Sequence, residues 1–425
     1  MLYYLFSYLD TIGFPGARMI TYVTFRAVTA AILALIVSIW YGKHFINRMK
    51  RKHIEETQRD EKLDPFNVKK TGVPTMGGII IIAATLIPCL LVSKLHNIYM
   101  ILMIITTLIL GVIGFADDYI KTFKKNKEGL NGWVKIAGQV TLGLIVGLTL
   151  RFSPAVQMNE TVQLKIENNQ EIVVKSPDVK STRTTIPFLK NHNLNYANLF
   201  KWAGEKWMYI LGWVFFVLVT VFAVAAVSNG SNLNDGMDGM SAGNTAIMAL
   251  TIGILAYISS NARTASYFDL MYIPGTEEIV VFLSAFVGAL LGYIWYNSFP
   301  AQVFMGDTGS LTIGGIIAVA AVIIHKELLL PIICGVFLFE SLSVILQRLY
   351  YKTGKKKGVH RRIWKRTPVH DHFRTSLDFI QQVDPGCTVK YKGQHDLHHE
   401  AKITMRFWIV SILLAAFTIL TLKIR

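Results

Sequence analysis

Long apolar blocks constrain the fold of this chain more than any other feature. About ten of them approach the roughly 20 residues that a helix needs to cross the hydrocarbon of a bilayer. Only 16% of the 425 residues are charged, whereas a soluble protein carries about a quarter. The sequence therefore predicts an all-α polytopic membrane protein with about ten transmembrane helices. The blocks are 19–41, 75–93, 97–116, 133–150, 207–228, 241–259, 279–297, 311–324, 328–349 and 403–422.

One block, 311–324, is shorter than the others. Either the preceding loop extends it into a full span, or it forms half of a re-entrant pair with the block 328–349. A pair of helices crosses the membrane twice or not at all. Both alternatives therefore leave the sidedness of the later loops unchanged.

Positive charge lies mainly on alternate loops. The loops 42–74 and 350–402 contain many lysines and arginines. By the positive-inside rule these loops, and 117–132, 229–240 and 298–310 with them, are predicted to be cytoplasmic, with both termini outside. The net charge of +16 is better explained by this orientation and by anionic substrates than by nucleic acid.

One long insertion lies on the opposite, external side. Residues 151–206 contain two alternating runs around Asn168-Asn169, a pattern that is typical of a β-hairpin. The chain is thus divided into helices at 1–150, a small external insertion at 151–206, and further helices at 207–425. We expect no catalytic chemistry in the insertion.

The unusual polar clusters all fall on the predicted cytoplasmic side. They are "GFADDYIK" with Asp117 and Asp118, "SNGSNLNDGMDGM", "NSFPAQVFMGDTGS" with Asp307, and "KRTPVHDHFR". Carboxylates that converge at a membrane boundary repel one another unless a cation neutralises them. Oxygen ligands without thiolates favour Mg²⁺. Carboxylates, Mg²⁺ and nearby lysines together indicate phosphoryl transfer.

Each cluster also has a structural interpretation. Asp117-Asp118 could be the solvated end of a helix, and Asp307 or Ser310 could cap the following one. Lys70 could be an interfacial lysine whose ammonium reaches water. The histidines of two loop groups could be incidental or solvated, although His395 and His399 have the spacing of a zinc pair on a helix. Buried Glu340 and Arg26 could each pair with a neighbouring helix.

Five strings occur in a fixed order along the chain: "KKTGVPTMGG" (69–78), "ADDYIK" (116–121), "NLNDGMDG" (232–239), "VFMGDTGS" (303–310) and "TPVHDHF" (367–373). In order and spacing they resemble the bacterial phospho-N-acetylmuramoyl-pentapeptide transferases of the polyprenyl-phosphate hexose-1-phosphate transferase superfamily. The resemblance covers nearly the whole chain except 151–206. It implies transfer of phospho-MurNAc-pentapeptide from UDP-MurNAc-pentapeptide to undecaprenyl phosphate, giving lipid I and UMP. It also implies ten transmembrane helices, Mg²⁺ dependence, a homodimer and the bacterial inner membrane, with both termini periplasmic.

The resemblance also assigns roles to particular residues. Asp307 would be the Mg²⁺ ligand, Asp117 the base toward the lipid phosphate, and Asp118 a positioning or metal-contacting partner. His370, with His372, falls in the histidine loop of the family and would contact the sugar phosphate. The remaining positions implied to bind substrate are Lys70, Thr75, Lys121, Lys135, Asn229, Asn232, Asp235, Asn297, Phe304 and Gln347.

The chain departs from the family pattern at three places. Asp371 stands where the middle of three consecutive histidines is usual, Asn234 replaces a usual threonine, and the insertion is longer. A direct attack by the lipid phosphate and a double displacement through an aspartyl phosphate both remain open. The alternative functions are an N-acetylglucosamine-1-phosphate transferase acting on the same kind of lipid and, in another class, a secondary transporter.

Overall fold

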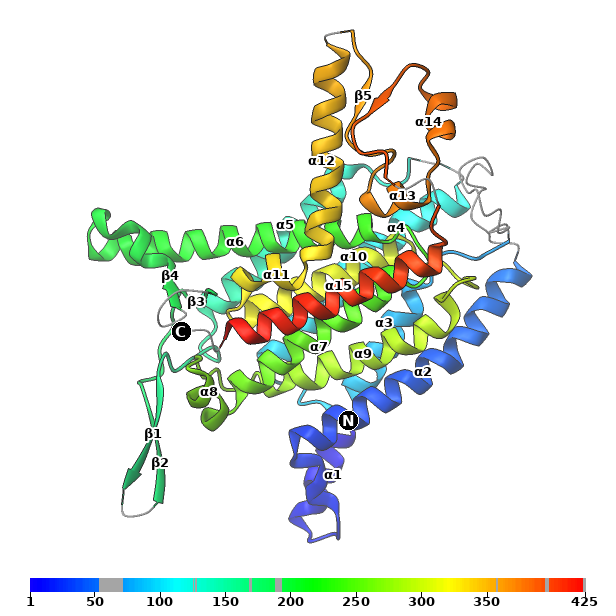
Figure 1. Cartoon of the computed structure of the whole chain (residues 1–425). Helices are drawn as coiled ribbons and strands as arrows, with labels where there is room; N and C mark the ends of the chain where they lie inside the picture. Colours follow the sequence, from blue (N-terminus) through cyan, green and yellow to red (C-terminus); the bar gives the residue numbers. More distant parts are fainter. Residues whose placement is uncertain are drawn as a thin grey trace.

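Eight helices of the described residues are long and apolar enough to cross a bilayer, or nine spans if a bent pair is counted as one. The computed structural model describes residues 1–52, 72–124, 126, 128–167, 170–187, 193–356, 358–393 and 397–422. The eight helices are α2 (Val23–Arg51), α4 (Ile98–Phe123), α5 (Gly132–Phe152), α6 (Glu205–Asn234), α7 (Met240–Ser260), α9 (Glu277–Asn297), α10 (Gly306–Ile323) and α15 (Glu400–Thr421). They form one bundle, which confirms the predicted all-α polytopic fold (Figure 1).

The number of spans differs from the expected ten. The block 75–93 forms α3 (Gly78–Val92), which has only 15 residues and is about 22 Å long, less than the roughly 30 Å of bilayer hydrocarbon. The bent pair joins Glu327–Ile333 to α12 (Gly335–Lys355) at an angle of 76° and includes η5 (Glu327–Leu329) and α11 (Leu330–Ile333). Within the part of the chain that the structure describes, length and composition therefore support eight or nine spans.

The short block 311–324 is a full helix. The preceding loop supplies its first turn, so α10 begins at Gly306 and has 18 residues, of which 89% are buried. Its length and composition favour the full-span alternative for this block, and the bend lies between Ile333 and Gly335, in the next block. Long runs of small and β-branched residues let α10 occupy the centre of the bundle, where neighbouring helices cover it on all sides.

Glycines bring α10 against two neighbouring helices at backbone distance. A Cβ atom on Gly114 of α4 would lie 2.3 Å from the carbonyl oxygen of Asp307. A Cβ on Gly78 of α3 would lie 2.1 Å from the nitrogen of Gly309. Side chains at these glycines would push the helices apart. The first turn of α10 is therefore held against α4 at the level of Asp117-Asp118.

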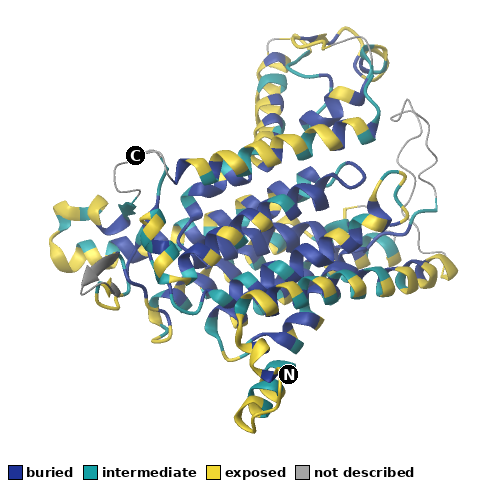
Figure 2. Ribbon diagram, turned by 60° about the horizontal axis from the view of Figure 1, so that its bottom comes forward, coloured by how far each residue is buried: buried dark blue, intermediate teal, exposed yellow. Residues whose placement is uncertain are grey.

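The outer helices present apolar side chains outward. In α15 only 22% of the apolar window is buried, and exposed residues such as Leu413 and Leu420 line its outer face. Figure 2 shows buried residues concentrated in the middle of the bundle and exposed ones along its outer helices. An exposed apolar surface of this extent is expected where lipid chains replace water.

The predicted hairpin is present in the insertion. β1 (Val162–Glu167) pairs with β2 (Gln170–Lys175) in antiparallel register, and Asn168-Asn169 lie outside the described residues. A second pair, β3 (Arg183–Thr185) and β4 (Asn193–Asn195), leads into η4 (Tyr196–Ala203). Lys326 Nζ donates to Thr185 Oγ1 at 2.6 Å just after α10 ends. The insertion is thus attached to the end of α10 opposite Asp307.

Short elements complete the chain. The loop after α12 holds a parallel pair of two-residue strands beside the part of α12 that projects from the bundle (Figure 1). The remaining elements are α1 (Leu2–Thr11), η1 (Ala17–Thr21), α8 (Ala262–Phe268), β5 (Arg361–Arg362), α13 (Val369–Arg374), α14 (Leu377–Val383) and β6 (Thr388–Val389).

Candidate active site

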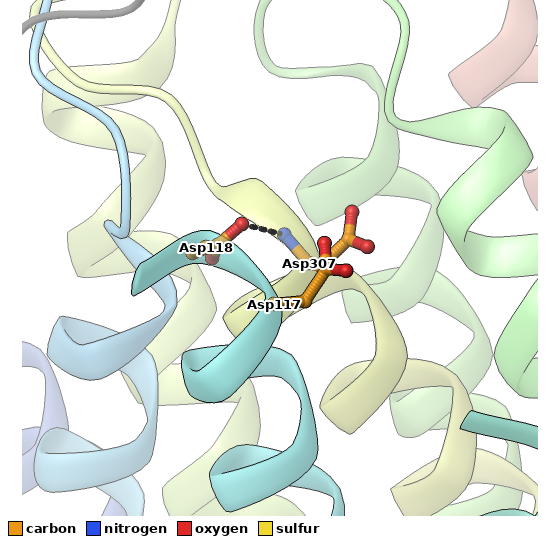
Figure 3. Close-up of side chains that lie close together, drawn as sticks. All are labelled: Asp117, Asp118 and Asp307. Atoms are coloured by element: carbon orange, nitrogen blue, oxygen red, sulfur yellow. Dashed lines mark hydrogen bonds between the residues drawn. The ribbon is translucent and has the colours of Figure 1, made fainter. Parts of the chain in front are cut away.

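Three carboxylates meet where α4 and α10 touch. Asp117 and Asp118 come from the last turns of α4, and Asp307 comes from the first turn of α10 (Figure 3). One oxygen from each lies within 4.8 Å of the others. α4 continues to Phe123, and both of its aspartates are buried. The interpretation of Asp117-Asp118 as a solvated helix end is therefore wrong.

Asp118 caps α10 from the neighbouring helix. Its Oδ1 accepts from the backbone nitrogen of Asp307 at 2.9 Å, as Figure 3 shows. Its Oδ2 accepts from the nitrogen and the hydroxyl of Thr308 at 2.8 and 2.5 Å. These bonds satisfy amides that a helix start leaves unpaired, and they place a negative charge at the positive end of the helix dipole. The alternative in which Asp307 or Ser310 caps α10 is wrong.

The turn before this cap requires glycine. Gly306 has a φ of 69°, and a Cβ there would lie 2.5 Å from Asp118 Oδ2. Both the left-handed backbone and the close carboxylate exclude a side chain. The "MGD" turn is thus shaped to receive Asp118.

Asp117 and Asp307 share two lysines. Lys135 Nζ, from α5, lies 2.8 Å from Asp117 Oδ1 and 2.5 Å from Asp307 Oδ2. Lys121 Nζ lies 2.5 Å from Asp117 Oδ2 and 3.3 Å from Asp307 Oδ2. Asn232 Nδ2, from α6, donates to Asp307 Oδ1 at 2.9 Å. Four helices thus bring together five of the residues predicted for the site.

The carboxylate set fits a hard divalent cation. All donors are carboxylate oxygens, which Mg²⁺ prefers, and neither thiolate nor imidazole belongs to the described cluster. Both oxygens of Asp118 already accept hydrogen bonds from α10. Among the described residues, the carboxylate oxygens of Asp307 contact only side chains, those of Lys121, Lys135 and Asn232, so Asp307 would be the residue that holds the ion.

An amide chain that the sequence did not reveal continues the site along α5 and α6. Asn229 Nδ2 donates to Gln139 Oε1 at 2.9 Å, and Gln139 Nε2 donates to Ser228 Oγ at 3.3 Å. Gln139 lies four residues after Lys135 on the same face of α5. That spacing, with a buried amide inside an apolar block, is the signal that could have identified it.

The segment before α3 lies beside the turn that leads to Asp307. Phe304 donates its backbone N–H to the carbonyl of Pro74 at 2.8 Å, and its own carbonyl accepts from Gly77 at 2.8 Å. Thr75 is buried between these contacts. Thr75 and Phe304 are therefore close to each other, and their predicted substrate contacts stay predictions. Lys70 lies outside the described residues.

Two predicted residues hold loops. Asn297 accepts from the nitrogen of Gly239 at 3.0 Å and donates to the carbonyl of Val303 at 2.9 Å, so it links the loops that follow α6 and α9. Gln347 of α12 accepts from the backbone nitrogen of Ile363 at 2.9 Å and donates to the carbonyl of Trp364 at 3.1 Å, so it holds the loop after α12. Both side chains position loops, so their predicted substrate contacts stay predictions.

The histidine loop forms α13, and Glu340 orients its first histidine. Glu340 Oε2 lies 2.7 Å from His370 Nδ1, and Glu340 Oε1 accepts from the backbone of His370 at 3.3 Å. The other ring nitrogen faces the loop after α6, because a Cβ on Gly236 would lie 2.2 Å from His370 Nε2. His370 is thus brought to the loop that Asp235 begins as the C-cap of α6. The sequence left both a functional and a structural role open for Glu340, and the structure shows it bound to His370 of this loop.

The unusual Asp371 holds arginines. Its carboxylate lies 2.7 Å from Arg374 Nη2 and 3.3 Å from Arg366 Nε. Burial alone would raise its pKa, but His370 and the two arginines lower the pKa below the usual value. Asp371 is therefore a charged anchor of the loop.

The other histidines have local structural contacts. Burial, followed by the nearby charge of Lys365, lowers the pKa of His372 to about 4, so its neutral ring accepts from the backbone of Lys365 at 3.2 Å. His399 caps α15, and His398 stacks on Phe373. His395 lies outside the described residues.

Thr308→Val should show how much the hydrogen bond from the start of α10 to Asp118 contributes to stability and to activity. The change removes one of the three donors to buried Asp118, and we expect a loss of roughly 1–3 kcal/mol of stability together with at least about tenfold lower activity. Thr312→Val is the matched control, because Thr312 is equally buried in α10 and donates only to the carbonyl of Thr308. Unfolding midpoints and turnover rates of both variants in one detergent test this. Equal effects of the two changes would contradict it.

This fold and this site define a membrane-embedded transferase, with carboxylates and lysines gathered at one end of a helical bundle. Residues 100–325 match the family model described as glycosyl transferase family 4. Over the full length of both chains, 63% of residues are identical to the phospho-N-acetylmuramoyl-pentapeptide-transferases of Bacteroides fragilis and Phocaeicola vulgatus. The enzyme of that name from Porphyromonas gingivalis is 49% identical over its full length. The chain belongs to the phospho-N-acetylmuramoyl-pentapeptide-transferase family.

Proposed function

We propose that this enzyme transfers phospho-MurNAc-pentapeptide from UDP-MurNAc-pentapeptide to undecaprenyl phosphate. The products are lipid I and UMP, and the reaction is the first membrane step of peptidoglycan synthesis. The observation that carries the proposal is the Asp117–Asp307 pair bridged by Lys121 and Lys135. Such a cluster offers both the anions that hold a metal and the cations that bind phosphate oxygens.

The location of the cluster suits two substrates of opposite solubility. Asp117 and Asp307 lie at helix ends, at one end of the bundle. A lipid phosphate in the membrane and a nucleotide in water can meet there. We place this end on the cytoplasmic face, with both termini periplasmic, because the positive-inside rule assigns the basic loops 42–74 and 350–402 of the sequence, and the loops 117–132 and 298–310 with them, to the cytoplasm. We also propose that the enzyme works as a homodimer.

In the proposed mechanism Asp307 and Asp117 have different roles. Asp307 would hold Mg²⁺, and the ion would supply the positive charge that polarises the oxygens of the donor pyrophosphate. Lys121 and Lys135 balance the charge of the donor phosphates, and Asn232 keeps Asp307 oriented. Asp117 orients the lipid phosphate and takes any proton that remains on it. A lipid phosphate is largely ionised at neutral pH, so its alignment matters more than its activation.

We favour direct attack. An oxygen of the lipid phosphate bonds to the phosphorus that carries the sugar, and the bond from that phosphorus to the bridging oxygen of UMP breaks. In the double displacement, an aspartate would first take the phosphosugar as an acyl phosphate. Incubating the enzyme with donor alone and searching Asp117 for a phosphosugar adduct by mass spectrometry discriminates between them. A trapped adduct that reacts on with lipid phosphate would contradict direct attack.

Donor choice tests the function itself. Purified enzyme in nanodiscs should release UMP from UDP-MurNAc-pentapeptide only when undecaprenyl phosphate is present, and UDP-GlcNAc should give roughly 100-fold less. Chelation of divalent ions should stop the release, and Mg²⁺ should restore it. Preferred use of UDP-GlcNAc would assign the neighbouring activity. Vesicle uptake without UMP release would instead support a transporter.

A further inference from the structure

A groove between α12 and α15 has no part in the chemistry described above. It has a volume of about 360 Å³, at the lower end of the range of ligand pockets. Its walls are almost entirely apolar, with Val336 and Phe339 on α12 and Phe407, Val410 and Leu414 on α15. α12 projects from the bundle at a steep angle to α15, and the two helices are in contact near the start of α12 (Figure 1). The groove therefore faces the lipid.

One end of the groove carries a cation. Arg406 lines the groove and is exposed, and within the described part of the chain it makes no ion pair. It is the last charged residue before the uncharged stretch 407–422 of α15. An arginine at this position lies at the level of the lipid headgroups, with apolar chain beyond it.

The cation and the apolar wall are aligned. Arg406, Val410 and Leu414 are spaced by four residues and share one face of α15, over about 12 Å. Gly335 lets the start of α12 lie close to Leu414, because a Cβ there would lie 2.8 Å from Leu414 Cδ1. A ligand with an anionic head and one extended apolar chain matches this arrangement.

We propose that the groove binds an anionic phospholipid of the bilayer, with its phosphate on Arg406 and one acyl chain along α15. A phospholipid is favoured over the lipid substrate by position. α15 packs against α7, α11 and α12, whereas Asp117 and Asp307 belong to α4 and α10. The volume suits one acyl chain and is small for a long prenyl chain.

The bound lipid also supports the histidine loop. Val369 and Phe373 of α13 line the groove on either side of His370, and His370 is held by Glu340. When an acyl chain fills the groove, the apolar side chains of α13 pack against that chain. We therefore expect anionic phospholipid to stabilise the enzyme as well as to bind it.

Native mass spectrometry of the full chain in neutral detergent tests the inference. Phosphatidylglycerol should bind at least tenfold more tightly than phosphatidylcholine with the same acyl chains. Arg406→Gln should remove this preference, whereas Lys402→Gln, an exposed cation one turn earlier on α15, should retain it. Val410→Trp should reduce binding of both lipids by filling the groove. Ile409→Trp, an equally exposed neighbour outside the groove, should not.

Three outcomes would overturn the inference. The first is an unchanged phosphatidylglycerol preference in Arg406→Gln. The second is wild-type lipid binding in Val410→Trp. The third is displacement of phosphatidylglycerol by equimolar undecaprenyl phosphate, which would assign the groove to the lipid substrate. None of these measurements depends on turnover, so they stand apart from the test of the transferase activity.

Discussion

Asp307→Asn should lower the rate of UMP release by roughly 10³-fold, which corresponds to about 4 kcal/mol of transition-state stabilisation. Asp307 is the point at which Lys121, Lys135 and Asn232 converge. An amide keeps the shape of the side chain but removes the charge that would hold Mg²⁺. The two lysines then face Asp117 alone. Donor phosphates would lose the metal and would meet an unbalanced cationic cluster.

The measurement compares turnover and Mg²⁺ dependence in wild type and variant. Asp384→Asn is the control, because Asp384 also pairs with basic side chains, Arg362 and His360, but in the loop after α12. We expect the control to keep its activity within about twofold. A variant of Asp307 that retains more than a tenth of the wild-type rate with unchanged Mg²⁺ response would remove this residue from the metal role.

Arg26→Met should be the most destabilising single change of a charged residue outside the site. Arg26 Nη1 lies 2.6 and 2.8 Å from the two oxygens of Glu278, and both side chains are fully buried between α2 and α9. Removing one partner leaves the other charge buried without compensation. Such changes cost about 3–5 kcal/mol. This contact also explains the unassigned arginine in the first apolar block.

Unfolding in mixed micelles measures the effect. The double variant Arg26→Met with Glu278→Leu should recover most of the lost stability, because it leaves no unpaired charge. The neighbouring surface pair of Lys94 and Glu277 lies at 3.6 Å with both side chains partly exposed, so Lys94→Met should cost less than about 1 kcal/mol. Equal stability of the single and double variants would contradict the prediction.

Much of the candidate site could be predicted from sequence because its residues stand out against an apolar background. Asp117, Asp118, Asp307, Lys121, Lys135 and Asn232 were all predicted, and the structure brings them together. Gln139 was missed because one amide in an apolar block is also common as a helix contact. The cap that Asp118 makes on α10 was not predicted, because the direction in which a residue at the end of one helix finds its partners depends on which helix packs beside it.

The number of spans is a second feature that could not be predicted from the sequence alone. Hydropathy marks apolar blocks, but it does not tell where a helix begins or bends. The loop before 311–324 became the first turn of α10, and the block 328–349 contains a bend of 76°. The contacts that decide these boundaries join residues far apart in the chain.

By itself the sequence determined that this chain is a polytopic membrane protein with its acidic clusters at one end of the helices. The length of the apolar blocks reflects the thickness of the bilayer, and the position of charged residues between the blocks reflects the cost of burying charge. Only the tertiary structure decided that Asp118 caps α10 while Asp117 and Asp307 share two lysines. That division depends on Gly114 and Gly306, which let α4 approach α10 until residues 189 positions apart share hydrogen bonds.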